Sequence, residues 1–256
     1  MNLPQEFLTR MQKRLGTAYP AFLRCYDAPP VRGVRANLLK CSAQAFKDLA
    51  PFADESVPWA EGGFYTASEK LGHMPAHHAG LFYVQEPSAM CAAPLLAAKP
   101  GERVLDLCAA PGGKTTQLAA AMRGEGLLVA NEYVYDRARI LSQNVERLGV
   151  KNCTVISADT AALAKKLPAY FDKILVDAPC SGEGMFRKDA GAIAEWSEEN
   201  VERCISRQRE ILDNAAEMLA GGGSLVYSTC TFEAGENEEQ IAQFLARHSD
   251  IVLKEQ

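Results

Sequence analysis

The chain has 256 residues, of which 48% are apolar and 23% charged, and its formal net charge is −5. These fractions are typical of a soluble globular protein with one large domain or two unequal ones. No apolar run approaches the ~18–20 residues that a membrane-spanning helix needs, and the N-terminal sequence MNLPQE lacks the pattern of a signal peptide. We therefore expect a cytoplasmic protein that does not associate with a membrane.

The eight cysteines are widely spaced, and the closest two lie 16 residues apart. No Cys-x-x-Cys pair or similar zinc-ligand spacing exists, so we expect no metal site. A disulfide framework is not expected in a chain of this size without a secretion signal. Five cysteines are interpreted as small buried apolar residues: Cys25, Cys41, Cys91, Cys153 and Cys204.

Charge is unevenly distributed along the chain. Residues 1–48 contain eight basic and three acidic side chains, a balance of +5, whereas the remaining residues carry −10. A basic segment on an acidic chain is typical of a surface that faces phosphate groups, although an ordinary solvated helix face gives the same pattern.

The N-terminal third predicts a small mixed lobe. Apolar residues at helical spacing indicate an amphipathic helix over residues 3–15, and a strand is expected over 32–39. Ser42 is a candidate N-cap for a helix that ends at residue 49. The glycine- and proline-rich residues 51–80 are expected to be mostly loop, and an apolar helix is expected over 89–98.

From residue 101 the pattern changes to alternating strands and helices. Strands are expected over 103–107, 127–131, 153–157, 173–176, 224–228 and 251–254. Helices are expected over 115–122, 136–148, 161–167, 198–219 and 236–246. This alternation predicts an α/β fold with a doubly wound, mostly parallel, Rossmann-like sheet. We expect a small α+β lobe over residues 1–80 and the sheet domain over residues 81–256.

A glycine-rich turn follows the first strand of that domain, with the sequence DLCAAPGGKT at residues 106–115. The P-loop pattern fails because its first glycine would stand where Cys108 is, and no Gly-x-Gly-x-x-Gly fingerprint is present. The interpretation that remains is a tight turn into a helix whose N-terminus faces a ligand. Acidic residues at or after the ends of successive strands accompany this turn: Asp106, Glu132 and Asp159. Glu132 suits a ribose diol, and Asp159 suits an adenine edge or, alternatively, a helix cap. This pattern fits S-adenosylmethionine better than ATP.

Two cysteines follow later strands, Cys180 within DAPCSG and Cys230 within STCT. Ligands of an open α/β sheet bind beyond the carboxyl ends of its strands, so we expect both thiols and the glycine-rich turn at one cleft. Thiols beside a nucleotide-like cofactor suit covalent chemistry on an electrophilic carbon.

Three motifs in this order, DLCAAPGGKT, DAPCSGEG and STCT, resemble those of the Sun/Fmu family of RNA (cytosine-5) methyltransferases. The segments RAN (35–37), QEPSA (85–89) and RQREI (207–211) are similar to the bacterial ribosomal RNA branch of RsmF type. The resemblance covers essentially the whole chain and implies a class I methyltransferase. Members of that branch continue into a further strand and a C-terminal PUA-like domain, which we expect this chain to lack.

The resemblance also implies roles for individual residues. Cys230 is expected to attack C6 of cytosine, Cys180 to assist product release, and Asp177 to contact the cytosine N3/N4 edge, with Lys114 near the base or the thiolate. The family's cofactor-binding pattern falls on Cys108, Ala109, Ala110, Pro111, Gly112, Gly113, Lys114, Glu132, Arg137, Asp159 and Asp177.

RNA is the expected partner, with ribosomal RNA favoured over transfer RNA, and the protein is expected to be monomeric. Residues of the basic lobe are the candidates for RNA contact: Arg32, Arg35, Asn37 and Lys40. Two alternatives are a transfer RNA methyltransferase and a non-catalytic RNA-binding assembly factor. A DNA cytosine-5 methyltransferase is a third, but it would use Cys180 as the nucleophile and leave Cys230 without a role.

Overall fold

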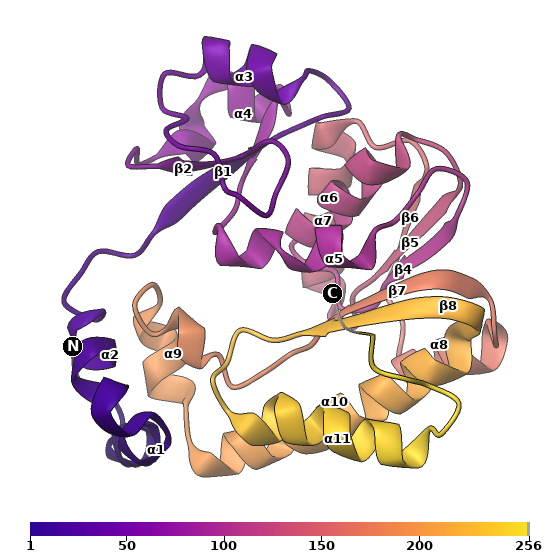
Figure 1. Ribbon diagram of the computed structural model, residues 1–256. Coiled ribbons are helices and arrows are strands. Elements are labelled where there is room, and N and C mark those ends of the chain that lie inside the picture. The colour runs from indigo at the N-terminus through magenta and orange to yellow at the C-terminus, as the bar shows by residue number, and fades with distance from the viewer. Residues whose placement is uncertain (255–256) are drawn as a thin grey trace. The chain divides into compact units, whose positions relative to one another are not determined.

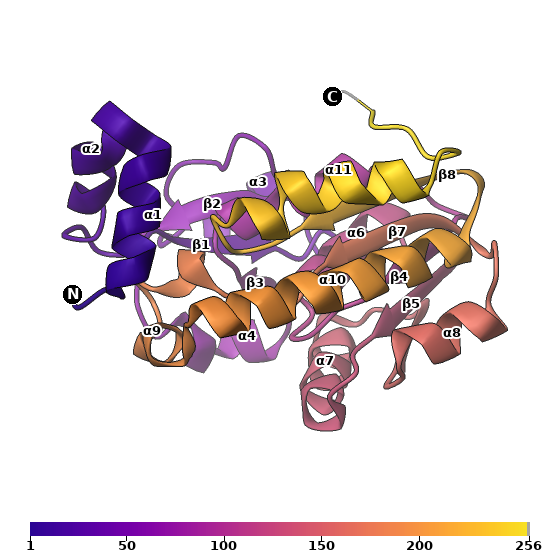
Figure 2. The same cartoon turned by 90° about the horizontal axis from the view of Figure 1, so that it is seen from below.

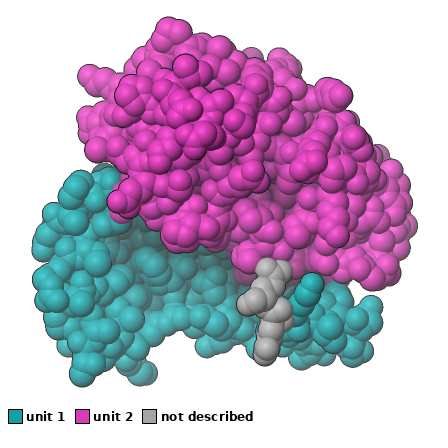
Figure 3. All heavy atoms as spheres, turned by 45° about the horizontal axis from the view of Figure 1, so that its top comes forward, with its two compact units in different colours: residues 1–30, 179–210, 229–254 teal, residues 31–178, 211–228, 255–256 magenta. Residues whose placement is uncertain are grey.

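The computed structural model describes residues 1–254, which form two compact units (Figure 3). Unit 1 comprises Met1–Pro30, Pro179–Glu210 and Thr229–Lys254, and unit 2 comprises Val31–Ala178 and Ile211–Ser228. This division differs from the expected boundary at residue 80, because residues 31–80 belong to the same unit as the parallel sheet. No helix within residues 1–254 is both long enough and apolar enough to cross a membrane.

The larger sheet of unit 2 has five parallel strands in the order β6-β5-β4-β7-β8 (Figure 1). They are β4 (Arg103–Asp106), β5 (Leu127–Asn131), β6 (Cys153–Ile156), β7 (Phe171–Asp177) and β8 (Leu219–Ser228). The predicted Rossmann-like parallel sheet is therefore confirmed. The strand expected over residues 251–254 is wrong: these residues have no regular structure, and Val252 and Leu253 are 82% and 72% exposed.

Helices cover both faces of this sheet. Successive residues of a strand point to opposite faces, and apolar side chains on each face pack against helices. Leu105 and Ile174 pack with α8 (Thr160–Lys166) and with the C-terminal part of α10 (Glu198–Met218). Their neighbours Val104 and Leu175 pack with α5 (Ala92–Leu96) and α6 (Gly113–Met122). The helix α7 (Tyr135–Leu148) packs on β5.

The smaller sheet of unit 2 is antiparallel, with the order β2-β1-β3. It contains β1 (Arg32–Ala36), β2 (Gly63–Thr66) and β3 (Phe82–Val84), and it carries α3 (Ala43–Leu49) and α4 (Pro75–His78) on a core of aromatic rings. The predicted cap is confirmed, since Ser42 Oγ accepts from the Ala45 N–H at 3.2 Å. The first strand ends earlier than expected because Asn37 opens a turn, and β2 and α4 lie within the predicted loop.

Unit 1 is helical. It contains α1 (Gln5–Leu15), α2 (Tyr19–Arg24), α9 (Ala190–Glu195), the N-terminal part of α10, and α11 (Glu238–Arg247) (Figure 2). The buried face of α1 supplies Phe7, whose ring lies 5.1 Å from that of Phe186 in an edge-to-face contact. Two single-turn 3-10 helices, η4 (Glu183–Met185) and η5 (Ala234–Glu236), follow the two candidate thiols.

Candidate active site

A cavity of about 230 Å³ lies in unit 2 at the carboxyl end of β4, where an open α/β sheet binds ligands. Its walls come from β3 and the segment after it, from the glycine-rich turn, and from the end of β7. The lining residues are Tyr83, Val84, Gln85, Glu86, Ala89, Asp106, Cys108, Ala109, Ala110, Pro111, Gly113, Lys114 and Asp177. Most of the predicted cofactor-binding turn is therefore brought together at one cavity.

The turn leads directly into the N-terminus of α6. Gly112 has φ +109°, a conformation that favours glycine, and it is the N-cap of α6. A Cβ on Gly113 would lie 3.3 Å from Tyr83 Cε1 and 3.4 Å from the side chain of Gln85, so β3 packs closely on this turn. The free N–H groups of the first helical turn thus begin at the cavity wall.

Asp106 is buried at the cavity, and its two carboxylate oxygens differ in their partners. Oδ2 accepts from the Thr115 hydroxyl at 2.6 Å, whereas Oδ1 is buried with no hydrogen-bond partner in the part of the chain that the structure describes. Burial raises the pKa of Asp106 to about 7. An acceptor without a partner at the cavity is a feature expected of a site that binds a ligand carrying donor groups.

Lys114 forms an ion pair with Asp177 in this cavity. The Lys114 Nζ atom lies 2.5 Å from Asp177 Oδ2, and Ser228 Oγ donates to Asp177 Oδ1 at 2.8 Å. A cation and a hydroxyl thus fix the carboxylate at the end of β7. The structure therefore places Lys114 on Asp177, a partner that the sequence did not suggest.

Arg35 is a buried residue of β1, only 2% exposed, and not a surface cation. It donates to Gln85 Oε1, to the Gly113 carbonyl and to Thr116 Oγ1, each at 2.8 Å. Burial lowers the pKa of Arg35 to about 10. The prediction that Arg35 contacts RNA directly is wrong, because its guanidinium is used inside the unit to hold Gln85 against the turn.

Asn37 is also buried, at 1% exposure, and donates to the carbonyls of Gly80 and Leu148 at 2.8 Å. Its predicted contact with RNA is wrong for the same reason. Arg32 and Lys40 are exposed, with Arg32 paired to Glu69 at 2.6 Å, and their contact with RNA stays a prediction.

Glu132 follows β5 and is buried. Its Oε1 accepts from the Val134 N–H at 2.9 Å, and Oε2 lies 3.3 Å from Arg137 Nη1. Arg137 also donates to the Ala110 carbonyl at 3.1 Å, which ties the end of β5 to the glycine-rich turn. Both residues lie beside the turn, and their predicted contacts with a cofactor stay predictions.

Asp159 is the N-cap of α8. Its Oδ1 accepts from the N–H groups of Ala161 and Ala162 at 3.0 and 3.1 Å. The alternative interpretation of this residue as a helix cap is therefore confirmed, and its contact with an adenine edge stays a prediction.

The two thiols meet in unit 1. Cys180 Sγ lies 3.2 Å from Cys230 Sγ, and the Cys230 N–H donates to Cys180 Sγ at 3.3 Å. The hydrogen bond with Cys230, together with burial, raises the pKa of Cys180 above its usual range. Either thiol can be the donor in this contact, and Cys230 is the more exposed of the two.

The segments that carry these thiols are held together by further hydrogen bonds. The Gly184 N–H donates to the Cys230 carbonyl at 2.8 Å. Glu236 accepts from the Ser181 hydroxyl at 2.5 Å and from Gln208 Nε2 at 2.8 Å, and burial raises the pKa of Glu236. Glu236 was not predicted as a site residue, although it stands only six residues after Cys230 in the sequence.

All eight cysteines lie among the described residues, and each is a free thiol. Cys204 is buried, and burial raises the pKa of Cys153 to about 12, as expected for cysteines that pack as apolar residues. The same interpretation is wrong for Cys25, which is exposed.

The fold and the cavity define a Rossmann-like methyltransferase. A methyltransferase homologue from Pyrococcus horikoshii superposes with a TM-score of 0.80 at 33% identity, covering 95% of this chain and 83% of that chain. NSun6 from Pyrococcus horikoshii, whose crystal structure was determined with SFG, has the same fold, with a TM-score of 0.87 at 23% identity over 99% of this chain and 89% of that one.

The chain belongs to the RsmB/F family of 16S rRNA methyltransferases, whose sequence model matches residues 93–256. The model of the N-terminal domain of the 16S rRNA methyltransferase RsmF matches residues 3–87. The chain is 40% identical to ribosomal RNA small subunit methyltransferase F of Cronobacter sakazakii and 42% identical to that of Serratia proteamaculans, in each case over 98% of this chain and 55% of the relative. It thus spans about half the length of the curated relatives it matches, and the family resemblance drawn from its motifs is confirmed.

Proposed function

We propose that this protein transfers a methyl group from S-adenosylmethionine to C5 of a cytosine in RNA, with 16S ribosomal RNA as the favoured substrate. The observation that carries the proposal is the contact of the Cys180 and Cys230 thiols, 3.2 Å apart, in a chain of the RsmB/F family. The relatives' names support the RNA substrate, and the reaction on ribosomal RNA is proposed to take place in the cytoplasm.

The cavity in unit 2 suits S-adenosylmethionine. Asp106 offers a carboxylate oxygen without a partner in the described chain, and the N-terminus of α6 opens at the same wall. Glu86 adds a further carboxylate to the lining, which favours a ligand that carries positive charge, whereas the charge of Asp177 is balanced by Lys114. When bound, S-adenosylmethionine supplies an electrophilic methyl group on a sulfonium centre.

The chemistry requires a thiol because C5 of cytosine is a weak nucleophile. When the Cys230 thiolate forms a bond to C6, the electron pair of the C5–C6 double bond becomes available at C5. C5 would then take the methyl group, and S-adenosylhomocysteine would leave with the electron pair of the broken sulfur–methyl bond. Loss of the C5 proton to a base and of the sulfur from C6 then restores the double bond and frees Cys230. Splitting the reaction in this way replaces one difficult step by several easier ones.

The two thiols are assigned different roles because they stand in different motifs and differ in exposure. The pKa of Cys180 is raised by its hydrogen bond with Cys230 and by burial, and either thiol can be the donor in that hydrogen bond. Cys230 is the more exposed thiol, and the resemblance of its STCT motif assigns it as the attacking residue. Cys180, which contacts Cys230 at 3.2 Å, is assigned to the release step, as the family resemblance implies.

Asp177 is assigned to bind the target cytosine ring. Lys114 and Ser228 hold its carboxylate at the end of β7, and Cys180 follows only three residues further along the chain. A fixed carboxylate that accepts from the cytosine amino group orients the ring and stabilises charge as the thiolate adds. The target base must be unpaired or flipped from its stack for C6 to be attacked.

Methyl transfer from labelled S-adenosylmethionine to total bacterial RNA, with mapping of 5-methylcytosine, tests this function. The arms are this chain, its Cys230→Ala variant, and Cys25→Ala as a matched control at an exposed cysteine of the same unit. The methyltransferase F of Serratia proteamaculans serves as the positive control.

We expect label on C5 of cytosine in 16S RNA with this chain and with Cys25→Ala, and none with Cys230→Ala. Label that persists in Cys230→Ala, or no transfer by this chain under conditions in which the relative is active, would overturn the proposal. Label on transfer RNA alone would favour the alternative substrate.

A further inference from the structure

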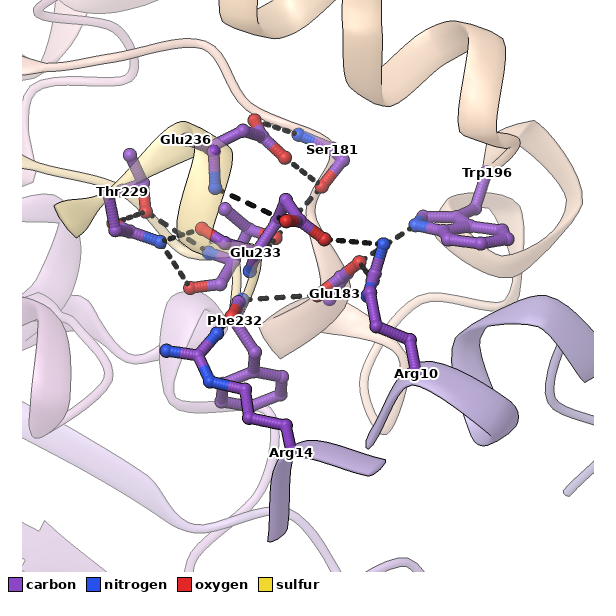
Figure 4. Close-up of polar contacts among 12 residues, drawn as sticks. Arg10, Arg14, Ser181, Glu183, Trp196, Thr229, Phe232, Glu233 and Glu236 are labelled. Atoms are coloured by element: carbon purple, nitrogen blue, oxygen red, sulfur yellow. Dashed lines mark hydrogen bonds and ion pairs between the residues drawn. The ribbon is translucent and has the colours of Figure 1, made fainter. Parts of the chain in front are cut away.

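An arginine of the N-terminal helix bridges the two thiol-bearing segments in unit 1 (Figure 4). Glu183 stands three residues after Cys180, and Glu233 stands three residues after Cys230. Arg10 Nη2 pairs with Glu183 Oε1, and Arg10 Nη1 lies 2.5 Å from Glu233 Oε2. One guanidinium on α1 thus contacts both segments, although it lies more than 170 residues before them in the sequence.

Glu183 is the more constrained of the two carboxylates. Its side chain is fully buried, and it also accepts from Trp196 Nε1 at 3.0 Å and from the Phe232 N–H at 3.1 Å. Phe232 stands two residues after Cys230, so this carboxylate on the first segment binds the backbone of the second. A buried carboxylate needs a counter-charge to remain ionised, and within residues 1–254 the ion pair to Glu183 comes from Arg10.

The helix that carries Arg10 is itself held firmly. Phe7 and Met11 on α1 are buried against Phe186 and Trp196, and the Arg10 guanidinium lies 5.4 Å from the centre of the Trp196 ring. Because the helix backbone is fixed by this packing, its guanidinium is presented to both carboxylates at a fixed place.

We infer that Arg10 is a positioning residue for the proposed cysteine pair, acting through Glu183 and Glu233 to hold the two thiols in contact. The inference rests on the proposed function, because the segments it braces carry the proposed nucleophile and its partner. It makes α1 part of the active site, a role that no motif around Arg10 indicates.

The rate at which the two thiols can be joined reports their relative position without RNA or methyl transfer. Diamide oxidises a pair of adjacent thiols to a disulfide: two thiol protons and two electrons pass to its N=N bond, which becomes a hydrazine. The Cys180–Cys230 disulfide is then quantified by peptide mass spectrometry on protein whose near-UV circular dichroism shows native packing.

We expect the disulfide to form at least tenfold more slowly in Arg10→Ala than in the wild-type chain. Arg10→Lys keeps the positive charge, but its single ammonium group cannot bridge both carboxylates as the two nitrogens of a guanidinium do. Its rate of disulfide formation should therefore lie between those of the wild-type chain and Arg10→Ala. Lys13→Ala removes an exposed cation from the same helix and should react like the wild type. A folded Arg10→Ala variant that forms the disulfide at the wild-type rate or faster would overturn the inference.

A double variant tests whether Arg10 positions the two segments or only balances the charge of Glu183. It also covers the case in which Arg10→Ala alone fails to fold because Glu183 is left without its counter-charge. In Arg10→Ala with Glu183→Gln, the buried charge and its counter-charge are removed together. We expect native circular dichroism but slow disulfide formation, because nothing bridges the segments. Recovery of the wild-type rate would show that Arg10 only balances charge and would contradict the inference.

Methyl transfer supplies the second readout. In Arg10→Ala, kcat should fall at least tenfold, whereas KM for S-adenosylmethionine should stay within twofold, because the described residues that line the cavity all belong to unit 2. If the wild-type chain transfers no methyl group, the proposed function fails, but the disulfide rates still decide whether Arg10 positions the thiols.

Discussion

Replacing Gly184 by alanine should impair the proposed nucleophile through backbone contact alone. A Cβ at this position would lie 2.7 Å from the Cys230 carbonyl oxygen, whereas ordinary contact begins at 3.4 Å, so one of the two segments must shift by about 0.7 Å. Gly184 does not have a positive φ, so this contact, and not backbone strain, is the cause. The shift also lengthens the 2.8 Å hydrogen bond from the Gly184 N–H to that carbonyl.

The expected loss follows from the size of this shift. A displacement of ~1 Å in a catalytic group can cost ~100-fold in rate, so Gly184→Ala should lower single-turnover methyl transfer by roughly 10- to 100-fold. The free energy of unfolding should fall by about 1–3 kcal/mol, the usual cost of overpacking a fitted site. Rates are measured at saturating RNA and S-adenosylmethionine, and stability by urea unfolding.

The matched control is Gly72→Ala, since a Cβ there meets nothing within 4 Å and the backbone φ is not positive. This variant should retain the wild-type rate and stability. A folded Gly184→Ala variant with a rate within threefold of the wild type would contradict this prediction, because the Cys230 backbone would then not need its observed position.

Three further predictions concern the cofactor cavity. Asp106 has a pKa of about 7 in the folded chain against an ordinary 3.8, so the folded state binds more protons than the unfolded state between these pH values. The free energy of unfolding should therefore fall, by up to ~4 kcal/mol, as the pH rises from about 4 to 7. Urea unfolding of Asp106→Asn at several pH values should lack this pH-dependent component. Lys114→Met leaves Asp177 without its cation, so we expect a drop of at least tenfold in methyl transfer, and an unchanged rate would contradict the assigned ion pair. Arg35→Met leaves Gln85 unbraced, so the affinity for S-adenosylmethionine measured by calorimetry should fall about tenfold in a folded protein; unchanged affinity would show that the brace is dispensable.

The parallel sheet was predictable because its strands are short apolar runs covered on both faces. The antiparallel sheet was only partly predictable from the sequence. The strand β2 lies in a glycine- and proline-rich segment and forms because β1 pairs with it, Arg32 opposite Thr66, a long-range contact that local propensity does not record. Conversely, the strand expected over residues 251–254 has the right composition but is exposed.

The site shows the same limit. Cys180 and Cys230 could be paired from the sequence, since both follow strands of one sheet. Arg35 stood in a basic segment and was expected to be exposed, but it is buried because Gln85 and the Gly113 carbonyl, 50 and 78 residues away, accept from it. The partner of Arg10 is even more distant in the sequence, since Glu183 is 173 residues away. Such contacts are set by tertiary packing and leave no periodic signal.

Covalent trapping of RNA tests the proposed role of Cys230 most directly. The Cys180→Ala and Cys230→Ala variants are incubated with unmodified 16S RNA and S-adenosylmethionine, and denaturant-resistant complexes are mapped by mass spectrometry of the nucleotide-bearing peptide. We predict that Cys180→Ala accumulates a complex with the nucleotide on Cys230, because the adduct forms but release is slow, and that Cys230→Ala forms none. A complex on Cys180, or equal trapping by both variants, would contradict the assignment of Cys230 as the nucleophile.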